Sequence, residues 1–232
     1  MDRVLNRIAS TVRSAMLFPA RALNAISGGR IKPNHVTLVS LLGHLLVVWA
    51  LYKDHPLWAA LFLAFFGIMD TLDGALAKLQ KTTSLKGMLY DATSDRVKEV
   101  LVYVGLALSV NQIYYIINVA GDSYWHYHYL QWYFVNNITP MWIIVAVCGM
   151  SLVVSYIKAK GEMALSGTGK YDAQQLNRIF SDGFARYEVR MALIILGLIT
   201  GTTFAVLHLL LILLIITALQ RIIRVSKALG NV

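Results

Sequence analysis

Apolar residues dominate this chain in runs long enough to cross a membrane. A helical run of about 20 residues spans the roughly 30 Å hydrocarbon core of a bilayer. We count about six such runs, which extend over residues 36–52, 57–77, 85–110, 141–164, 187–202 and 204–223. The pattern predicts an all-α, polytopic membrane protein with about six transmembrane helices.

The segment ahead of the first run is amphipathic rather than uniformly apolar. Its apolar residues recur at helical spacing, with arginines between them, at Val4, Leu5, Ile8, Val12 and Met16. This pattern is typical of a helix that lies along the lipid headgroups. The arginines interrupt the apolar stretch and no small-residue cleavage site follows, which argues against a signal peptide. We expect one membrane domain over 1–232, with an interfacial helix and connecting segment in 1–32 and the transmembrane bundle in 33–232.

Composition and charge agree with membrane insertion. Hydrophobic residues make up 57% of the chain and charged residues 14%, and the mean hydropathy is +0.60. Lysines and arginines cluster before the first run, around 78–86, around 158–190 and after the last run, whereas 109–140 contains none. The positive-inside rule therefore predicts that both termini and the segment around 78–95 are cytoplasmic. This distribution explains the net charge of +9 without a nucleic-acid partner.

Four aspartates stand inside apolar sequence, at Asp70, Asp73, Asp91 and Asp95. Residues three or four apart share one face of a helix, so each pair projects together and the two pairs can face each other. Carboxylates at membrane depth are costly unless they are paired with a cation. An all-oxygen set suits Mg²⁺ or Mn²⁺, and two such ions can clamp the phosphates of a diphosphate substrate.

Two other interpretations of these aspartates deserve comparison. Salt bridges with Lys86, Arg96 and Lys98 would balance much of their charge, but they would not explain the spacing. Nor would they explain Gly74 and Gly87, since glycine in a spanning helix lets a backbone or ligand approach closely. A divalent-cation transporter would need a polar trail toward the outer side, and the fourth to sixth runs contain none.

The complete spacing is Asp-x2-Asp-Gly-x2-Ala-Lys-x8-Gly-x3-Asp-x3-Asp, and it resembles the signature of the CDP-alcohol phosphotransferases. The resemblance implies an enzyme of phospholipid biosynthesis that transfers the phosphatidyl group of CDP-diacylglycerol to a polar alcohol and releases CMP. It also implies that Asp70, Asp73 and Asp91 bind metal, and that Asp95 is the general base and a ligand of the second ion. Family members are commonly dimers, so the chain is expected to form a homodimer. Lys78 replaces the family's usual arginine and lacks its planar fork.

The resemblance extends to the nucleotide site. Pro33-Asn34-x2-Thr37 is similar to the family segment that borders the cytidine nucleotide, although a helix cap alone would explain Asn34 or Thr37 equally well. Together with the motif, it implies a nucleotide site made of Asn34, Thr37, Asp73, Gly74, Ala77, Lys78 and Gly87.

A second group of cations lies on the fourth and fifth runs. It consists of Lys158 and Lys160, with Ser155 beside them, and of Arg186 and Arg190. This pair of segments resembles the phosphatidylinositol-phosphate synthases within the family, and the likeness implies that these five residues bind a phosphorylated acceptor. Lys160 and Gly161 depart from the usual residues, and Arg190 comes one position late. Inositol phosphate is the first expectation for the acceptor, followed by glycerol phosphate, inositol and serine; the alternative is that these charges only orient the protein. The expected location is a prokaryotic cell membrane.

Overall fold

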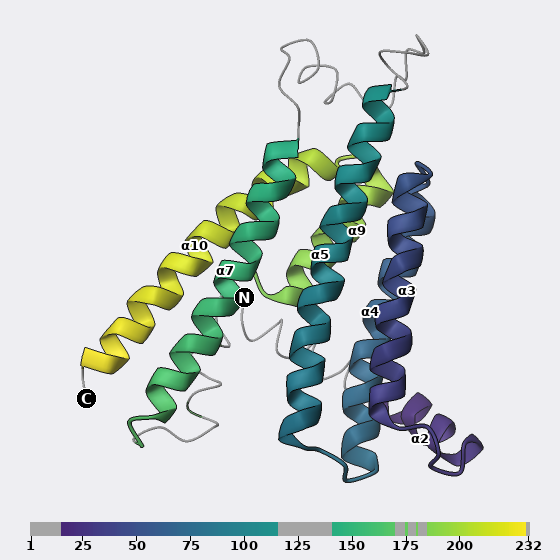
Figure 1. Ribbon diagram of the computed structural model, residues 1–232, viewed down its shortest axis with the longest axis vertical. Helices are drawn as coiled ribbons and strands as arrows, with labels where there is room; N and C mark the ends of the chain where they lie inside the picture. Colours follow the sequence, from purple (N-terminus) through teal and green to yellow (C-terminus); the bar gives the residue numbers. More distant parts are fainter. Residues whose placement is uncertain (1–14, 116–140, 170–174, 176–179, 181–184, 231–232) are drawn as a thin grey trace. The chain divides into compact units, whose positions relative to one another are not determined.

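The computed structural model describes residues 15–115, 141–169, 175, 180 and 185–230, and the elements bounded within these residues are all α-helices (Figure 1). Most of the amphipathic segment at positions 3–13 therefore lies outside the described residues. The helices are α2 (Leu17–Ile26), α3 (Pro33–Tyr52), α4 (Pro56–Leu79), α5 (Leu85–Tyr115), α7 (Met141–Ser166), α9 (Tyr187–Thr200) and α10 (Thr203–Gly230).

Each predicted apolar run corresponds to one of these helices. Four of them, α3, α4, α7 and α10, are long and apolar enough to span a membrane. The other two do not meet that description. Helix α9 has 14 residues, which gives about 21 Å, and α5 carries two aspartates and further charges within its first half. The prediction of an all-α, polytopic membrane protein is confirmed, while the crossing of the membrane by α5 and α9 stays a prediction.

The chain forms two compact units, residues 1–112 and 113–232. In the first unit, α3 and α4 form an antiparallel pair joined by a short turn (Figure 1). Pro33 occupies the first turn of α3, where its fixed φ favours a helix and its missing N–H costs nothing. The two helices approach closely at Gly43, because a Cβ there would lie 2.2 Å from the Phe66 ring.

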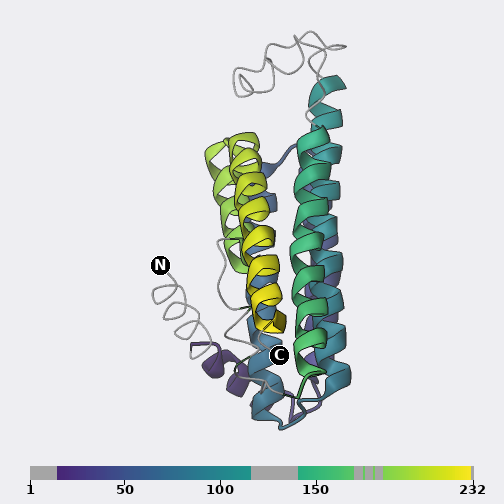
Figure 2. The ribbon, with the colours of Figure 1, turned by 90° about the vertical axis from the view of Figure 1, so that its left-hand side faces the viewer.

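Helix α2 packs on α4 and lies across the end of the α3–α4 pair (Figure 1 and Figure 2). The Gln80 amide fixes this arrangement, since its Nε2 donates to Asn24 Oδ1 and to the Ile31 carbonyl, both at 2.9 Å. Phe18 and Ile26 are 80% and 87% exposed. Such exposure of large apolar side chains suits a helix in the headgroup region.

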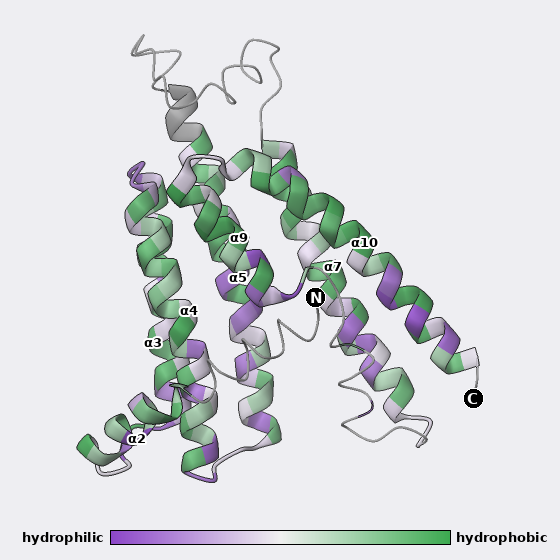
Figure 3. Ribbon diagram, turned by 180° about the vertical axis from the view of Figure 1, so that it is seen from behind, coloured by the Kyte–Doolittle hydropathy of each residue, from purple (hydrophilic) through white to green (hydrophobic). Residues whose placement is uncertain are grey.

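In the second unit, α10 contacts both α7 and α9 (Figure 2). Gly201 ends α9 in the left-handed conformation at φ +71°, which glycine adopts without steric cost. Hydrophilic positions of α7 and α10 gather toward the C-terminal ends of these helices (Figure 3). The buried faces of the unit are aliphatic, with Ile143, Ile194, Leu207 and Leu214 fully enclosed.

Candidate active site

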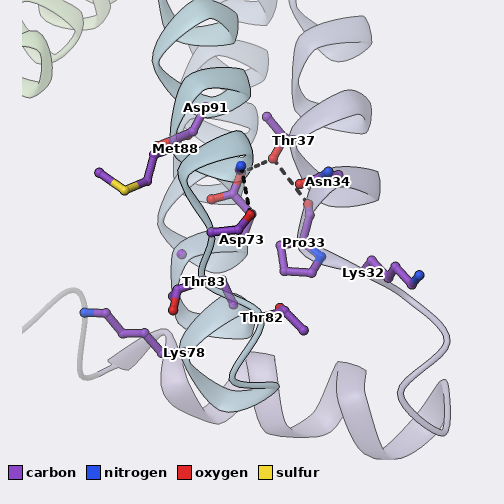
Figure 4. A pocket seen from close by; sticks show the side chains of 14 residues that line it. Lys32, Pro33, Asn34, Thr37, Asp73, Lys78, Thr82, Thr83, Met88 and Asp91 are labelled. Atoms are coloured by element: carbon purple, nitrogen blue, oxygen red, sulfur yellow. Dashed lines mark hydrogen bonds between the residues drawn. The ribbon is translucent and has the colours of Figure 1, made fainter.

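A cavity of about 290 Å³ lies in the first unit, where the start of α3, the end of α4 and the start of α5 meet (Figure 4). Ligand pockets typically begin near this volume. All seven residues predicted to border a nucleotide line it, and the complete lining is Lys32, Pro33, Asn34, Thr37, Asp73, Gly74, Ala77, Lys78, Thr82, Thr83, Ser84, Gly87, Met88 and Asp91. The structure thus brings the Pro-Asn-x2-Thr segment and the aspartate motif to one place.

Asp73 is held at the inner wall of this cavity by α3. Only 5% of the residue is exposed, and Thr37 Oγ1 donates to its Oδ2 at 2.5 Å. The same hydroxyl lies 3.2 Å from the Pro33 carbonyl oxygen. Figure 4 shows Thr37 between these two partners. The threonine therefore links the first turn of α3 to a motif aspartate of α4, a role that a simple helix cap would not require.

The two glycines of the motif leave space in the cavity. A Cβ added at Gly74 would meet nothing within 4 Å, and one at Gly87 would lie 3.3 Å from Ser84 Oγ. Lys78 and Lys32 line the rim, and their ammonium groups point outward on opposite sides (Figure 4). The cavity therefore combines carboxylates that can bind metal, space beside the glycine backbone and lysines at the rim. This combination suits a metal-bound ligand with several negative charges.

Asp70 and Asp95 do not line the cavity. They form ion pairs with one lysine, which is not part of the motif. Lys98 Nζ lies 2.6 Å from Asp70 Oδ1 and 2.9 Å from Asp95 Oδ1. Ser40 Oγ, on α3, donates to the same Asp70 oxygen at 2.8 Å. The four carboxylates therefore divide into a pair that lines the cavity, Asp73 and Asp91, and a pair bridged by lysine.

This arrangement can be compared with two interpretations of the aspartates, salt bridges and a metal site. Of the three cations in the salt-bridge alternative, Lys98 bonds to two motif aspartates. Arg96 pairs with Glu99 at 2.5 Å, and Lys86 Nζ lies 5.7 Å from the centroid of the Tyr90 ring. A lysine bridge thus accounts for part of the negative charge, but Asp73 and Asp91 have none of these partners in the described part of the chain.

The residues present fit a divalent cation by the chemistry of their oxygens. Asp73 lies within electrostatic range of both Asp70 and Asp91. Asp70 Oδ2 is buried and has no hydrogen-bond partner among the described residues, and such an oxygen is costly to leave unpaired. In the positions described, no three acidic, histidine or cysteine side chains are already arranged to hold an ion, so the four-carboxylate box is not closed and some side chains must turn to bind one.

The predicted acceptor residues all lie in the second unit. Ser155 Oγ donates to the Ser151 carbonyl at 3.0 Å. Lys158 Nζ is 3.8 Å from Glu162, and Lys160 Nζ is 5.9 Å from the centroid of the Tyr156 ring. Arg186 is the N-cap of α9. These four residues lie in the C-terminal half of α7 and at the start of α9.

Among the described residues of this unit, two arginines are buried, and one of them, Arg221, was not among the predicted site residues. Arg190 is 2% exposed and its Nη1 donates to the Ala185 carbonyl at 2.6 Å. Arg221 is 7% exposed and its Nη1 donates to the Val154 carbonyl of α7 at 2.8 Å. In the charge pattern of the sequence, Arg221 counts among the basic residues at the end of the last apolar run. Its only sequence signal is its place within the last apolar run.

Comparison with known proteins supports both the fold and the chemistry. Three relatives are an archaetidylinositol phosphate synthase of Pyrococcus horikoshii, 27% identical over 86% of this chain and 86% of its own length, and two phosphatidylinositol phosphate synthases. The one from Corynebacterium glutamicum is 30% identical over 57% of this chain and 52% of its length; the one from Streptomyces avermitilis is 26% identical over 78% and 68%.

Solved structures show the same fold. The Mycobacterium tuberculosis phosphatidylinositol phosphate synthase with CDP-DAG bound has a TM-score of 0.64 and 21% identity, and covers 90% of this chain and 92% of its own. The same protein with manganese and citrate also gives 0.64 and 21%, over 91% and 88%.

A sequence model of the CDP-alcohol phosphatidyltransferases matches residues 30–223, which include every residue of the aspartate motif. The match decides between enzyme and transporter in favour of an integral membrane phosphotransferase, in a family that depends on divalent cations. This chain belongs to the CDP-alcohol phosphatidyltransferase family.

Proposed function

We propose that this enzyme transfers the phosphatidyl group of CDP-diacylglycerol to inositol phosphate and releases CMP. The observation that carries the proposal is the cavity in the first unit, where all the residues expected to border a nucleotide lie together with Asp73 and Asp91. An open backbone at Gly74 leaves room for a ligand beside the carboxylates.

Asp70, Asp73, Asp91 and Asp95 would hold two divalent ions, Mg²⁺ or Mn²⁺. When bound, the ions neutralise the diphosphate and stabilise the leaving CMP. The protein itself supplies the walls of the site: Thr37 fixes Asp73, and Asn34 and Ala77 border the cavity. Lys78 at its rim offers a positive charge to phosphate, as a point charge rather than a bidentate fork.

Asp95 is the proposed general base. The acceptor hydroxyl loses its proton to this carboxylate, and the hydroxyl oxygen forms a bond to the phosphatidyl phosphorus. The bond from that phosphorus to the CMP oxygen breaks. One Asp95 oxygen is paired with Lys98, so the carboxylate is held in place during the transfer.

A phosphorylated acceptor is supported by the charges of the second unit and by the relatives. Lys158, Lys160 and Arg186 gather at the end of α7 and the start of α9, with Ser155 as a neighbouring hydroxyl, and Arg190 continues the series into the buried part of α9. The lipid products in the relatives' names differ in their lipid part, but each has inositol phosphate as its headgroup.

An acceptor panel tests this proposal. Purified enzyme with labelled CDP-diacylglycerol should form lipid product from inositol phosphate faster than from glycerol phosphate, inositol or serine, because an unphosphorylated alcohol leaves the cations without their anion. Replacing Lys158 or Arg186 with Gln should raise the KM for the acceptor about tenfold or more, since a charge-assisted contact contributes roughly 1.5–3 kcal/mol. The KM for the donor should stay unchanged. Equal use of inositol and inositol phosphate would contradict the proposed acceptor.

The topology and assembly follow from the same proposal. The cavity lies at the end of the first unit that carries the lysines at 78–86 and the basic segment before α3, so the positive-inside rule places it at the cytoplasmic face. Both termini would be cytoplasmic, in a prokaryotic cell membrane, and the functional unit would be a homodimer.

A further inference from the structure

Lys98 is a fully buried charge beside the aspartate motif. It lies one helical turn after Asp95, its side chain is 0% exposed, and its ammonium group bridges Asp70 on α4 and Asp95 on α5. An ammonium group without water is costly unless it is paired. The lysine therefore has a fixed position, set by two carboxylates from two helices.

The bridge engages only one oxygen of each aspartate. Lys98 contacts Oδ1 of Asp70 and Oδ1 of Asp95, and Ser40 donates to the same Asp70 oxygen. The second Asp70 oxygen, Oδ2, is buried and has no hydrogen-bond partner in the described residues. A carboxylate held through one oxygen in this way presents its other oxygen in a fixed direction.

We propose that Lys98 is a positioning residue of the metal site: by holding Oδ1 of Asp70 and Asp95, it orients their second oxygens toward the divalent cation. The proposal rests on the proposed function, in which both aspartates bind metal. Groups that hold metal ligands from behind typically contribute ten- to hundredfold to metal affinity.

Two other roles for Lys98 predict different outcomes. A lysine that only balances buried charge would affect folding stability, but not the metal affinity of the folded protein. A lysine that occupies the place of the cation would compete with it, so that its removal would tighten metal binding. Metal affinity therefore separates the three roles.

The experiment compares Mn²⁺ binding by the wild type and by Lys98→Met, each as the whole chain in detergent. The free Mn²⁺ is measured by electron paramagnetic resonance. We expect affinity ten- to hundredfold weaker in Lys98→Met. Lys86→Met is the matched control, because it removes an equal charge from an exposed position on the same helix; its affinity should equal that of the wild type. Unchanged or tighter binding in Lys98→Met would overturn the proposal.

A second pair of variants keeps the test decisive if Lys98→Met does not fold. Lys98→Gln keeps a donor for one carboxylate and should also weaken Mn²⁺ binding, and Ser40→Ala should weaken it to a smaller extent because Lys98 remains. The rise in Tm that Mn²⁺ causes should be smaller in Ser40→Ala than in the wild type, and smaller still in Lys98→Gln. A wild type that binds no Mn²⁺ would overturn the proposed metal site itself, whereas normal binding in both variants would overturn only the role of Lys98.

Discussion

The partners of each aspartate decide what that side chain can contribute to catalysis. Asp73 is fixed by Thr37 and Asp91 faces the open cavity, so both are available to a ligand that enters there. Asp70 and Asp95 share Lys98 and are not among the residues that line the cavity. Spacings of three and four residues along two helices thus yield four carboxylates in unequal surroundings.

Asparagine substitutions should show that the aspartates contribute differently to metal binding and catalysis. Asp91→Asn should abolish activity by weakening Mn²⁺ binding, because it removes a charge that faces the cavity. Asp95→Asn should abolish activity but keep more of the metal affinity, because its main loss is the proton acceptor. Turnover assays and Mn²⁺ titration of both variants check this, and equal loss of metal affinity would argue against Asp95 as the base.

Thr37 provides a separate test of the cavity. Thr37→Val keeps the shape but removes the hydroxyl that holds Asp73, so the KM for CDP-diacylglycerol should rise about tenfold, as expected for a hydrogen bond to a charged group. The KM for the acceptor should not change. Thr71→Val is the control, since Thr71 donates to the Ile68 carbonyl within its own helix, α4. A Thr37→Val enzyme with normal donor kinetics would show that the contact between Thr37 and Asp73 does not support donor binding.

At the scale of helices, the site depends on how closely α3 approaches α4. Ser40 and Thr37 reach Asp70 and Asp73 from α3, and Gly43 lies against Phe66 one turn beyond Ser40. A wider separation of these helices would break the contacts that hold both aspartates.

Gly43→Ala should therefore destabilise the protein. Its Cβ would lie 2.2 Å from the Phe66 ring, and overpacking of this kind costs about 1–3 kcal/mol. Thermal unfolding in detergent should show a lower Tm. Gly67→Ala, also on a spanning helix but with nothing within 4 Å of the added Cβ, should leave the Tm unchanged or raise it slightly, because alanine favours helix. Equal Tm values for both variants would contradict the close approach.

The apolar periodicity of the sequence predicted the helices, and the resemblance to the family implied seven of the residues that line the cavity. Residues 70, 73, 74, 77 and 78 share a short stretch of helix, so their spacing alone brings them to one end of α4. The sequence offered Lys98 only as one of three candidate partners of the aspartates, and the contacts of Lys98 and Arg221 could not be assigned in this way. Whether a lysine one turn beyond Asp95 reaches Asp70 depends on how α4 and α5 are rotated against each other, and the burial of Arg221 depends on its contact with Val154 of α7.

For the whole molecule, the distribution of charge predicts a single orientation in the membrane. Cysteines introduced at Ser27 and Lys227 in a Cys148→Ser background should react with a membrane-impermeant maleimide in inverted vesicles only. Lys53→Cys, in the turn at the opposite end of α3, should react only in right-side-out vesicles and serves as the control. Labelling of Ser27→Cys and Lys53→Cys from the same side would contradict the predicted topology.

The cavity has one further consequence, which concerns the order of biosynthesis. All its lining residues lie between Lys32 and Asp91, whereas the cations proposed for the acceptor begin at Lys158. Domains generally fold as units from the N-terminus during synthesis, and contacts close in sequence form early. We therefore expect a growing chain to complete the proposed nucleotide pocket before the ribosome has made the helices that carry the proposed acceptor cations, so that changes in acceptor choice can arise late in the chain without disturbing the assembly of the pocket.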